Sequence, residues 1–179
     1  MAGASVLLRR AAAAAVALTM LSFSAAAQAN LEYAVKAEYL AKLSPFIDWP
    51  AASFESGDSS INLCLLGHDP FGGLLDSAAH AEVLARTISV RRLTSAEPAA
   101  SCHILFVGSM AASQSLPESL GARPVLTVSD NEAIPAMIQF VIRQNHVRFV
   151  IDEGAARRAG VHISAKLLAL ALAVKRGPP

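Results

Sequence analysis

Short apolar runs that each end in small polar residues constrain the fold of this chain most. There are three such runs: Ile61–Leu66 before Gly67, Cys102–Val107 before Gly108-Ser109, and Pro124–Val128 before Ser129-Asp130. Runs of this length that are apolar almost throughout are typical of strands buried on both faces of a sheet. Residues 87–93 instead alternate, which predicts a strand with one wet face.

The remaining segments predict helices and a hairpin. Residues 137–142 and 147–151 flank Arg143-Gln144-Asn145-His146 and predict a β-hairpin. Helices are expected over 31–43, ended by Pro45, and over 74–84 and 116–120, with Asp69 as an N-cap and Pro70 at a first helical position. Asp152 is expected to cap a short helix through Arg158, and Ser164 to cap the last helix. The apolar positions of that last helix predict deep burial: Leu167, Leu168, Leu170, Ala171 and Val174. We therefore expect an α/β fold: a single domain with a mixed sheet, a C-terminal hairpin and helices packed on its faces.

The first 29 residues have the pattern of an export signal. Arg9 and Arg10 precede an apolar zone, 11–23, and Ala27-Gln28-Ala29 follows as a cleavage pattern. That zone has 13 residues, fewer than the roughly 20 that a membrane-crossing helix needs. We predict a signal peptide over 1–29 and one domain over 30–179 that does not itself span the membrane after cleavage; the alternative is an uncleaved anchor.

The balance of charges and the number of cysteines limit the kinds of partner and of cysteine chemistry that we expect. Without the two signal arginines, 13 basic and 14 acidic side chains remain, which gives no electrostatic reason to expect nucleic acid as a partner. Cys64 and Cys102 are the two cysteines, and in an oxidising compartment one pair favours a disulfide over free or reactive thiols. The first and third strands of such sheets commonly lie side by side, which would bring the two cysteines within bridging range.

A search for catalytic and metal-binding motifs finds none. Gly108-Ser109-Met110 lacks the second glycine of a nucleophile elbow, and the glycine-rich turn at 69–73 lacks the Lys-Ser/Thr of a phosphate loop. The five histidines are scattered, so surface or hydrogen-bonded roles are favoured over metal ligation: His68, His80, His103, His146 and His162. We expect no catalytic residue, metal or cofactor.

Polar residues after the strand ends are candidates for a ligand crevice. Ligands of α/β sheets bind outside the carboxyl ends of the strands. The candidates are Gly67, His68, Asp69, Gly108, Ser109, Ser129 and Asp130. Turn and capping roles use the same residue types and are the favoured alternative.

The order of motifs along the chain resembles the YfiR/HmsC family of periplasmic regulators. The resemblance rests on Tyr33-Ala34-Val35-Lys36-Ala37, Phe46-Ile47-Asp48-Trp49-Pro50, the stretches 61–72, 101–108 and 124–130, Val147-Arg148-Phe149, 155–160 and 164–168. There are two departures: Pro135-Ala136 stands where the family usually has a glycine pair, in a shortened loop, and Pro45 falls within the opening helix.

The resemblance implies a non-enzymatic periplasmic repressor. Such a protein binds the periplasmic part of an inner-membrane diguanylate cyclase and lowers cyclic di-GMP output, and it is released by an outer-membrane lipoprotein partner or by redox stress. Cys64 and Cys102 match family cysteine positions, and a homodimer is expected. Phe46, Trp49 and Phe71 are candidate partner contacts, with core packing as the alternative. A small ligand-binding or sensor protein that uses the strand-end crevice is the second hypothesis.

Overall fold

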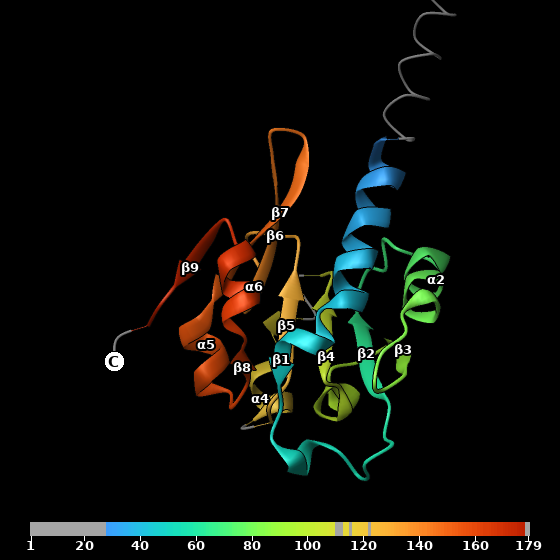
Figure 1. Ribbon diagram of the computed structural model, residues 1–179, viewed down its shortest axis with the longest axis vertical. Coiled ribbons are helices and arrows are strands. Elements are labelled where there is room, and N and C mark those ends of the chain that lie inside the picture. Colours follow the sequence, from blue (N-terminus) through green and yellow to red (C-terminus); the bar gives the residue numbers. More distant parts are fainter. Residues whose placement is uncertain (1–27, 110–112, 115, 122, 178–179) are drawn as a thin grey trace, which may run out of the picture.

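The main sheet of the protein has seven strands and is mixed. The computed structural model describes residues 28–109, 113–114, 116–121 and 123–177 (Figure 1). Within them the sheet order is β3 (Ile88–Leu93), β2 (Ile61–Leu66), β4 (Ile104–Val107), β5 (Leu126–Ser129), β6 (Ile138–Arg143), β7 (His146–Asp152) and β9 (Ala173–Lys175). All neighbours are parallel except β6 and β7. The predicted fold class is confirmed. The predicted signal peptide falls largely on residues 1–27, outside the described residues.

The predicted hairpin is confirmed, with a two-residue turn. Gln144 and Asn145 connect β6 to β7 and have φ angles of 51° and 60°. Two successive residues with positive φ produce the backbone twist that matches the right-handed twist of the flanking strands. Arg143 and His146 are the last paired residues on either side of this turn.

Helices cover both faces of the sheet, but unequally. The N-terminal helix, residues 28–42, packs on one face through buried Ala37, Leu40 and Ala41. On the opposite face, the 3-10 helix η3 (Glu97–Ser101) and helix α4 (Leu116–Leu120) contribute Ala99 and Leu116 to a second apolar cluster. Alternation along β2 and β4 supplies both clusters, because successive side chains of a strand point to opposite faces. Leu63 and Leu65 belong to the first cluster, and Cys64 and Leu66 to the second.

The remaining elements are short and surround this sheet. Helix α2 (Gly73–Ala81) follows β2, and α5 (Glu153–Arg158) and α6 (Ala165–Leu170) follow β7. The 3-10 helices η1 (Ser44–Phe46) and η2 (Ala51–Ser53) flank strand β1 (Ile47–Asp48), which pairs antiparallel with β8 (His162–Ile163). The N-terminal helix ends before Pro45, as expected, since proline cannot continue the helical hydrogen bonds.

Two predicted helix caps are confirmed and one is wrong. Asp152 accepts from the Ala155 amide at 2.7 Å, and Ser164 accepts from the Leu167 amide at 3.4 Å. Asp69 is not an N-cap, because α2 begins only at Gly73 and its N-cap is Gly72. The Asp69 carboxylate instead accepts from the amides of Phe71 and Gly72, which stabilises the turn that precedes the helix.

The predicted deep burial of the C-terminal segment holds fully only at Leu167. Leu170 is 65% exposed, and the other predicted positions are half-buried: Leu168, Ala171 and Val174. The helix ends at Leu170 because Ala171 adopts an extended backbone, and Ala173–Lys175 then form β9 against β7. Val174 therefore lies on a strand, where period-two geometry replaces the helical spacing on which the prediction relied.

Candidate functional site

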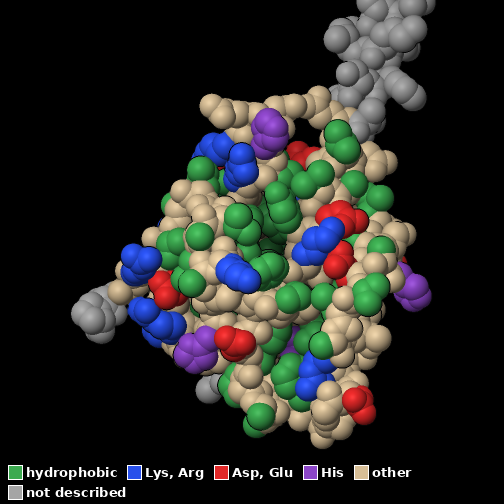
Figure 2. Space-filling view, viewed as in Figure 1, with side chains coloured by type: hydrophobic (Ala, Val, Ile, Leu, Met, Phe, Trp, Pro, Cys, Tyr) green, Lys and Arg blue, Asp and Glu red, His purple; other side chains and the backbone are tan. Residues whose placement is uncertain are grey.

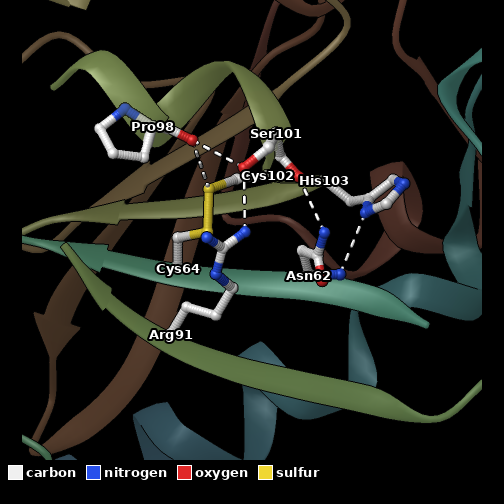
Figure 3. Close-up of a disulfide and its surroundings, with 7 residues drawn as sticks. All are labelled: Asn62, Cys64, Arg91, Pro98, Ser101, Cys102 and His103. Carbon is white, nitrogen blue, oxygen red and sulfur yellow. Dashed lines mark hydrogen bonds between the residues drawn. A yellow bond between two sulfur atoms is a disulfide. The ribbon is translucent and has the colours of Figure 1, made fainter.

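Cys64 and Cys102 form the predicted disulfide (Figure 3). Cys64 lies on β2, Cys102 lies just before β4, and the two Cα atoms are 6.0 Å apart. The two strands are hydrogen-bonded neighbours, as the sequence predicted. Cys64 is fully buried and Cys102 is 4% exposed. A reductant therefore reaches the sulfur atoms only when this part of the domain opens.

A hydrogen bond between β3 and η3 lies beside the disulfide. The Cys102 Sγ lies 3.8 Å from the Pro98 carbonyl, which also accepts from the Ser101 hydroxyl at 2.8 Å. Arg91 of β3 donates to the same hydroxyl at 3.0 Å (Figure 3). A hydrogen bond thus connects the edge strand β3 to η3, and Cys102, which follows η3, connects η3 to the disulfide covalently.

The buried side chain of His103, which follows Cys102 in the chain, contacts the loop after β1. Its Nδ1 accepts from the Asn62 amide at 3.0 Å, so Nε2 carries the proton and donates to the Ser53 carbonyl at 3.0 Å. The ring stacks on Phe54 at 4.6 Å and meets the edge of Trp49 at 5.8 Å. Burial lowers the pKa of His103, and the nearby Arg86 cation acts in the same direction. This histidine is hydrogen-bonded, as favoured from the sequence, but the aromatic stack around it was not predicted.

The strand-end residues come together, but they use their polar groups internally. The Ser129 hydroxyl donates to the Val107 carbonyl at 2.9 Å, and the Gly108 amide donates to the Leu66 carbonyl at 2.9 Å. A Cβ at Gly67 would lie 2.6 Å from that of Ser109, so these two turns are in close contact. Asp69 binds Arg92 at 2.7 Å, while His68 and Gly67 are exposed. Turn and capping roles account for these contacts, as the favoured alternative expected.

Lys36 of the N-terminal helix contacts one of the strand-end residues, Asp130. It is 4% exposed, and its Nζ lies 2.8 Å from Asp130 and 2.5 Å from Glu32. The ammonium also lies 4.5 Å from the centre of the Tyr33 ring. Burial opposes the charged form, but the hydrogen bonds to Asp130 and Glu32 prevail and raise the pKa of Lys36. The N-terminal helix therefore places a buried cation beside Asp130, one of the predicted crevice residues.

The three predicted contact aromatics have different surroundings. Phe71 is 2% exposed and packs on Phe106 at 4.8 Å, which is the core packing given as the alternative to partner contact. The turn after β2 points this ring into the core, where Tyr33 meets it at 5.6 Å. Phe46 and Trp49 are half-buried and packed at the rim of the core. They remain candidates for partner contact.

Several exposed or half-buried apolar side chains belong to the N-terminal helix, the end of β6 and the segment from α6 to β9. We use the name apolar face for Leu31, Tyr39, Ile142, Leu170 and Leu172. Tyr39 packs on Phe140 of β6 and Phe149 of β7, and the Leu172 amide donates to the Phe149 carbonyl. Figure 2 shows hydrophobic side chains in the middle of this side of the molecule, with charged side chains around them. This surface was not predicted from the sequence, because the helical spacing indicated deep burial for Leu170.

Among the described residues, no three His, Cys, Asp or Glu side chains gather where they could hold a metal ion. In the same part of the chain, no helix has both the length and the apolar character to cross a membrane.

The structure is that of a small mixed α/β domain with one buried disulfide between neighbouring strands of its sheet. The chain belongs to the YfiR/HmsC-like family, whose sequence model matches residues 33–172. The resemblance seen in the order of motifs is thereby confirmed.

Other comparisons are less informative. No protein of curated function matches the sequence. Among solved structures, a conserved domain protein from Vibrio cholerae O1 biovar El Tor strain N16961 is similar, with a TM-score of 0.48 and 10% sequence identity. The match covers 64% of this chain and 54% of that one, so the chain spans about half the length of this structural neighbour.

Proposed function

We propose that this protein is a periplasmic, non-enzymatic repressor that binds the periplasmic part of an inner-membrane diguanylate cyclase and lowers cyclic di-GMP output. Membership of the YfiR/HmsC-like family, regulators in this signalling context, is the observation that carries the proposal. The pattern of an export signal in residues 1–29 supports the periplasmic location. An outer-membrane lipoprotein as a second partner and a homodimer are part of the same proposal.

The apolar face supports a role in protein binding. Leu31, Leu170 and Leu172 are each more than half exposed, and Ile142 is 40% exposed. Exposed apolar side chains that gather in one place on a soluble domain mark interaction sites more often than isolated ones do. Phe46 lies beside the same region, because its carbonyl accepts from the Ser164 amide before α6. We propose that the cyclase covers this face, with Phe46 and Trp49 at its border.

The disulfide supports a redox-dependent form of this repression. It closes a loop between positions 38 residues apart, for which chain entropy suggests about 4 kcal/mol of stabilisation. A domain of this size has a total stability of roughly 5–15 kcal/mol. Reduction to two thiols would therefore populate open forms, in which the apolar face is no longer assembled.

A binding experiment tests the proposal. The mature protein is titrated against the purified periplasmic domain of the diguanylate cyclase encoded nearest to its gene, with and without reductant. We expect binding in the oxidised state and weaker binding after reduction. Absence of binding in both states would contradict the repressor role, whereas equal binding in both states would contradict only the redox dependence.

A pair of matched variants locates the interface. Leu172→Lys places a charge on the apolar face, and Val83→Lys places the same charge at a residue that is 98% exposed after α2. If the cyclase covers the apolar face, Leu172→Lys weakens binding at least tenfold, as loss of about 1.4 kcal/mol would, and Val83→Lys leaves it unchanged. Equal effects of the two variants would show that the interface lies elsewhere.

A further inference from the structure

A groove on the other side of the C-terminal half of the sheet has no role in the proposed repression. It has a volume of about 570 Å³ and is lined by residues of β5, β6, β7, β9, α5 and the loop before β6. Thr127, Gln139 and Val141 lie along it on β5 and β6. Sites for small molecules typically have volumes of roughly 300–1,000 Å³, so the groove is large enough for a small organic ligand.

The groove exists because helices cover only part of this face. The second apolar cluster, which includes η3 and α4, packs over β2 and β4 and holds no residue of β6, β7 or β9. Gln139 and Val141 alternate with Ile138 and Phe140, which point into the first cluster on the opposite face. One wall is formed by Pro135 and Ala136, where the sequence departs from the usual glycine pair of the family.

The charges that line the groove favour an anion. Arg143 on β6, Arg158 on α5 and Lys175 on β9 line it, and all three are exposed. Within the described residues, none of the three makes an ion pair. The two acidic residues of the lining are Glu132 and Asp152, and an oxygen of Asp152 accepts from the Ala155 amide at the start of α5.

An unpaired amide and apolar side chains complete the lining. The Gln139 Nε2 atom is buried and has no hydrogen-bond partner, and an orphaned donor of this kind is uncommon in folded proteins. Val141, Val150 and Met137 contribute apolar surface. From this combination we propose that the groove binds a small organic anion, whose charged group is held by the three cations and whose apolar body lies on the valines.

Two glycines let the backbone pass close to Arg158. A Cβ at Gly177 would lie 3.0 Å from the Arg158 Nη1, and a Cβ at Gly154 would lie 2.5 Å from the Gly177 amide nitrogen. The backbone after β9 therefore passes directly over the start of α5, beside the guanidinium. This close approach keeps Arg158 and Lys175 on adjacent elements at the same groove.

The test uses a pair of fluorescent probes that differ in charge alone. Anilinonaphthalene sulfonate is an aromatic anion, and phenylnaphthylamine is the same ring system without the sulfonate. We expect the anion to bind the oxidised protein with one saturable site per chain and the neutral probe to bind at least tenfold more weakly. Equal affinity for the two probes would overturn the assignment.

Charge-reversal variants test whether the sulfonate probe binds in the groove. Lys175→Glu and Arg158→Glu are each expected to raise the dissociation constant of the sulfonate about tenfold, a typical effect of losing one charge-assisted contact. The matched controls are Lys166→Glu and Arg123→Glu, exposed cations that do not line the groove. Ala136→Phe fills the groove without changing its charge and is expected to abolish binding. Binding that survives Ala136→Phe, or that the controls weaken equally, would overturn the proposal.

Discussion

The two halves of the main sheet are covered differently. Strands β2 and β4 have apolar side chains on both faces, under the N-terminal helix on one side and η3 and α4 on the other. Strands β6 and β7 place Phe140 and Phe149 in the first apolar cluster on one face, and the other face of β6 carries Gln139, Val141 and Arg143 along the groove. The disulfide lies in the first half and the groove in the second.

This difference separates stability from binding within one domain. A strand buried on both faces contributes apolar burial through every side chain, and the covalent bond adds to it. A strand covered on one face leaves alternate positions free to carry polar and charged groups. We therefore expect substitutions in β2 and β4 to change mainly the free energy of unfolding, and substitutions around β6, β7 and β9 to change mainly what the protein binds.

Loss of the disulfide is expected to have the largest effect. Cys64→Ser should lower the free energy of unfolding by about 4 kcal/mol, because the unfolded chain gains the entropy that the bond removed. Urea titration of the variant beside the oxidised protein measures this. A loss below about 1 kcal/mol would show that the covered half is stable without its covalent bond.

A matched pair of leucines tests the comparison directly. Leu66→Ala, at a side chain that is 2% exposed on β2, should cost about 3 kcal/mol through lost burial and the cavity left behind. Leu172→Ala, at a side chain that is 51% exposed, should stay within about 0.5 kcal/mol of the parent protein. Thermal melting of both variants at one pH is the measurement. Similar losses in the two variants would contradict the distinction between the halves.

The smallest expected effect is a dependence of stability on pH. Burial lowers the pKa of His103 in the folded state, whereas the unfolded chain keeps the ordinary value of 6.5. The unfolded state then binds more protons, so the stabilisation is complete above pH 6.5 and is lost as pH falls toward the lower folded pKa. The slope is at most about 1.4 kcal/mol per pH unit.

The comparison between His103 and His103→Gln isolates this contribution. Glutamine can accept and donate hydrogen bonds without titrating, so the variant should show a smaller loss of stability between neutral and mildly acidic pH. Melting curves across that range measure the difference. An identical pH dependence in both proteins would assign the effect to other groups.

Local chemistry explains why much of the fold was predictable from the sequence. The apolar runs before Gly67, Gly108 and Ser129 are strands, the Gln144-Asn145 turn is a hairpin, and Asp152 and Ser164 cap their helices. Each of these features depends on residues within a few positions of one another. The pairing of Cys64 with Cys102 was predictable too, because only two cysteines are present and their strands were expected to be neighbours.

The sites themselves were predicted less well. Asp69 was predicted to cap a helix, but α2 starts later than expected. Phe71 was predicted as a partner contact, but the turn directs its ring into the core. Leu170 and Val174 fit a buried helical stripe, but the chain leaves the helix after Leu170 to pair with β7. Lys36 sits four positions from Glu32, yet nothing nearby in the sequence indicates that Asp130 completes its site.

Residue order alone thus determined most of the strands, the hairpin turn, two helix caps, the fold class and the family, because these follow from side-chain pattern and short-range hydrogen bonding. Only the tertiary structure decided which residue pairs with Lys36, which leucines face solvent and which cations line a groove. Those outcomes depend on contacts between residues far apart in the chain, such as Lys36 with Asp130 and Arg158 with Gly177. No local pattern encodes such contacts.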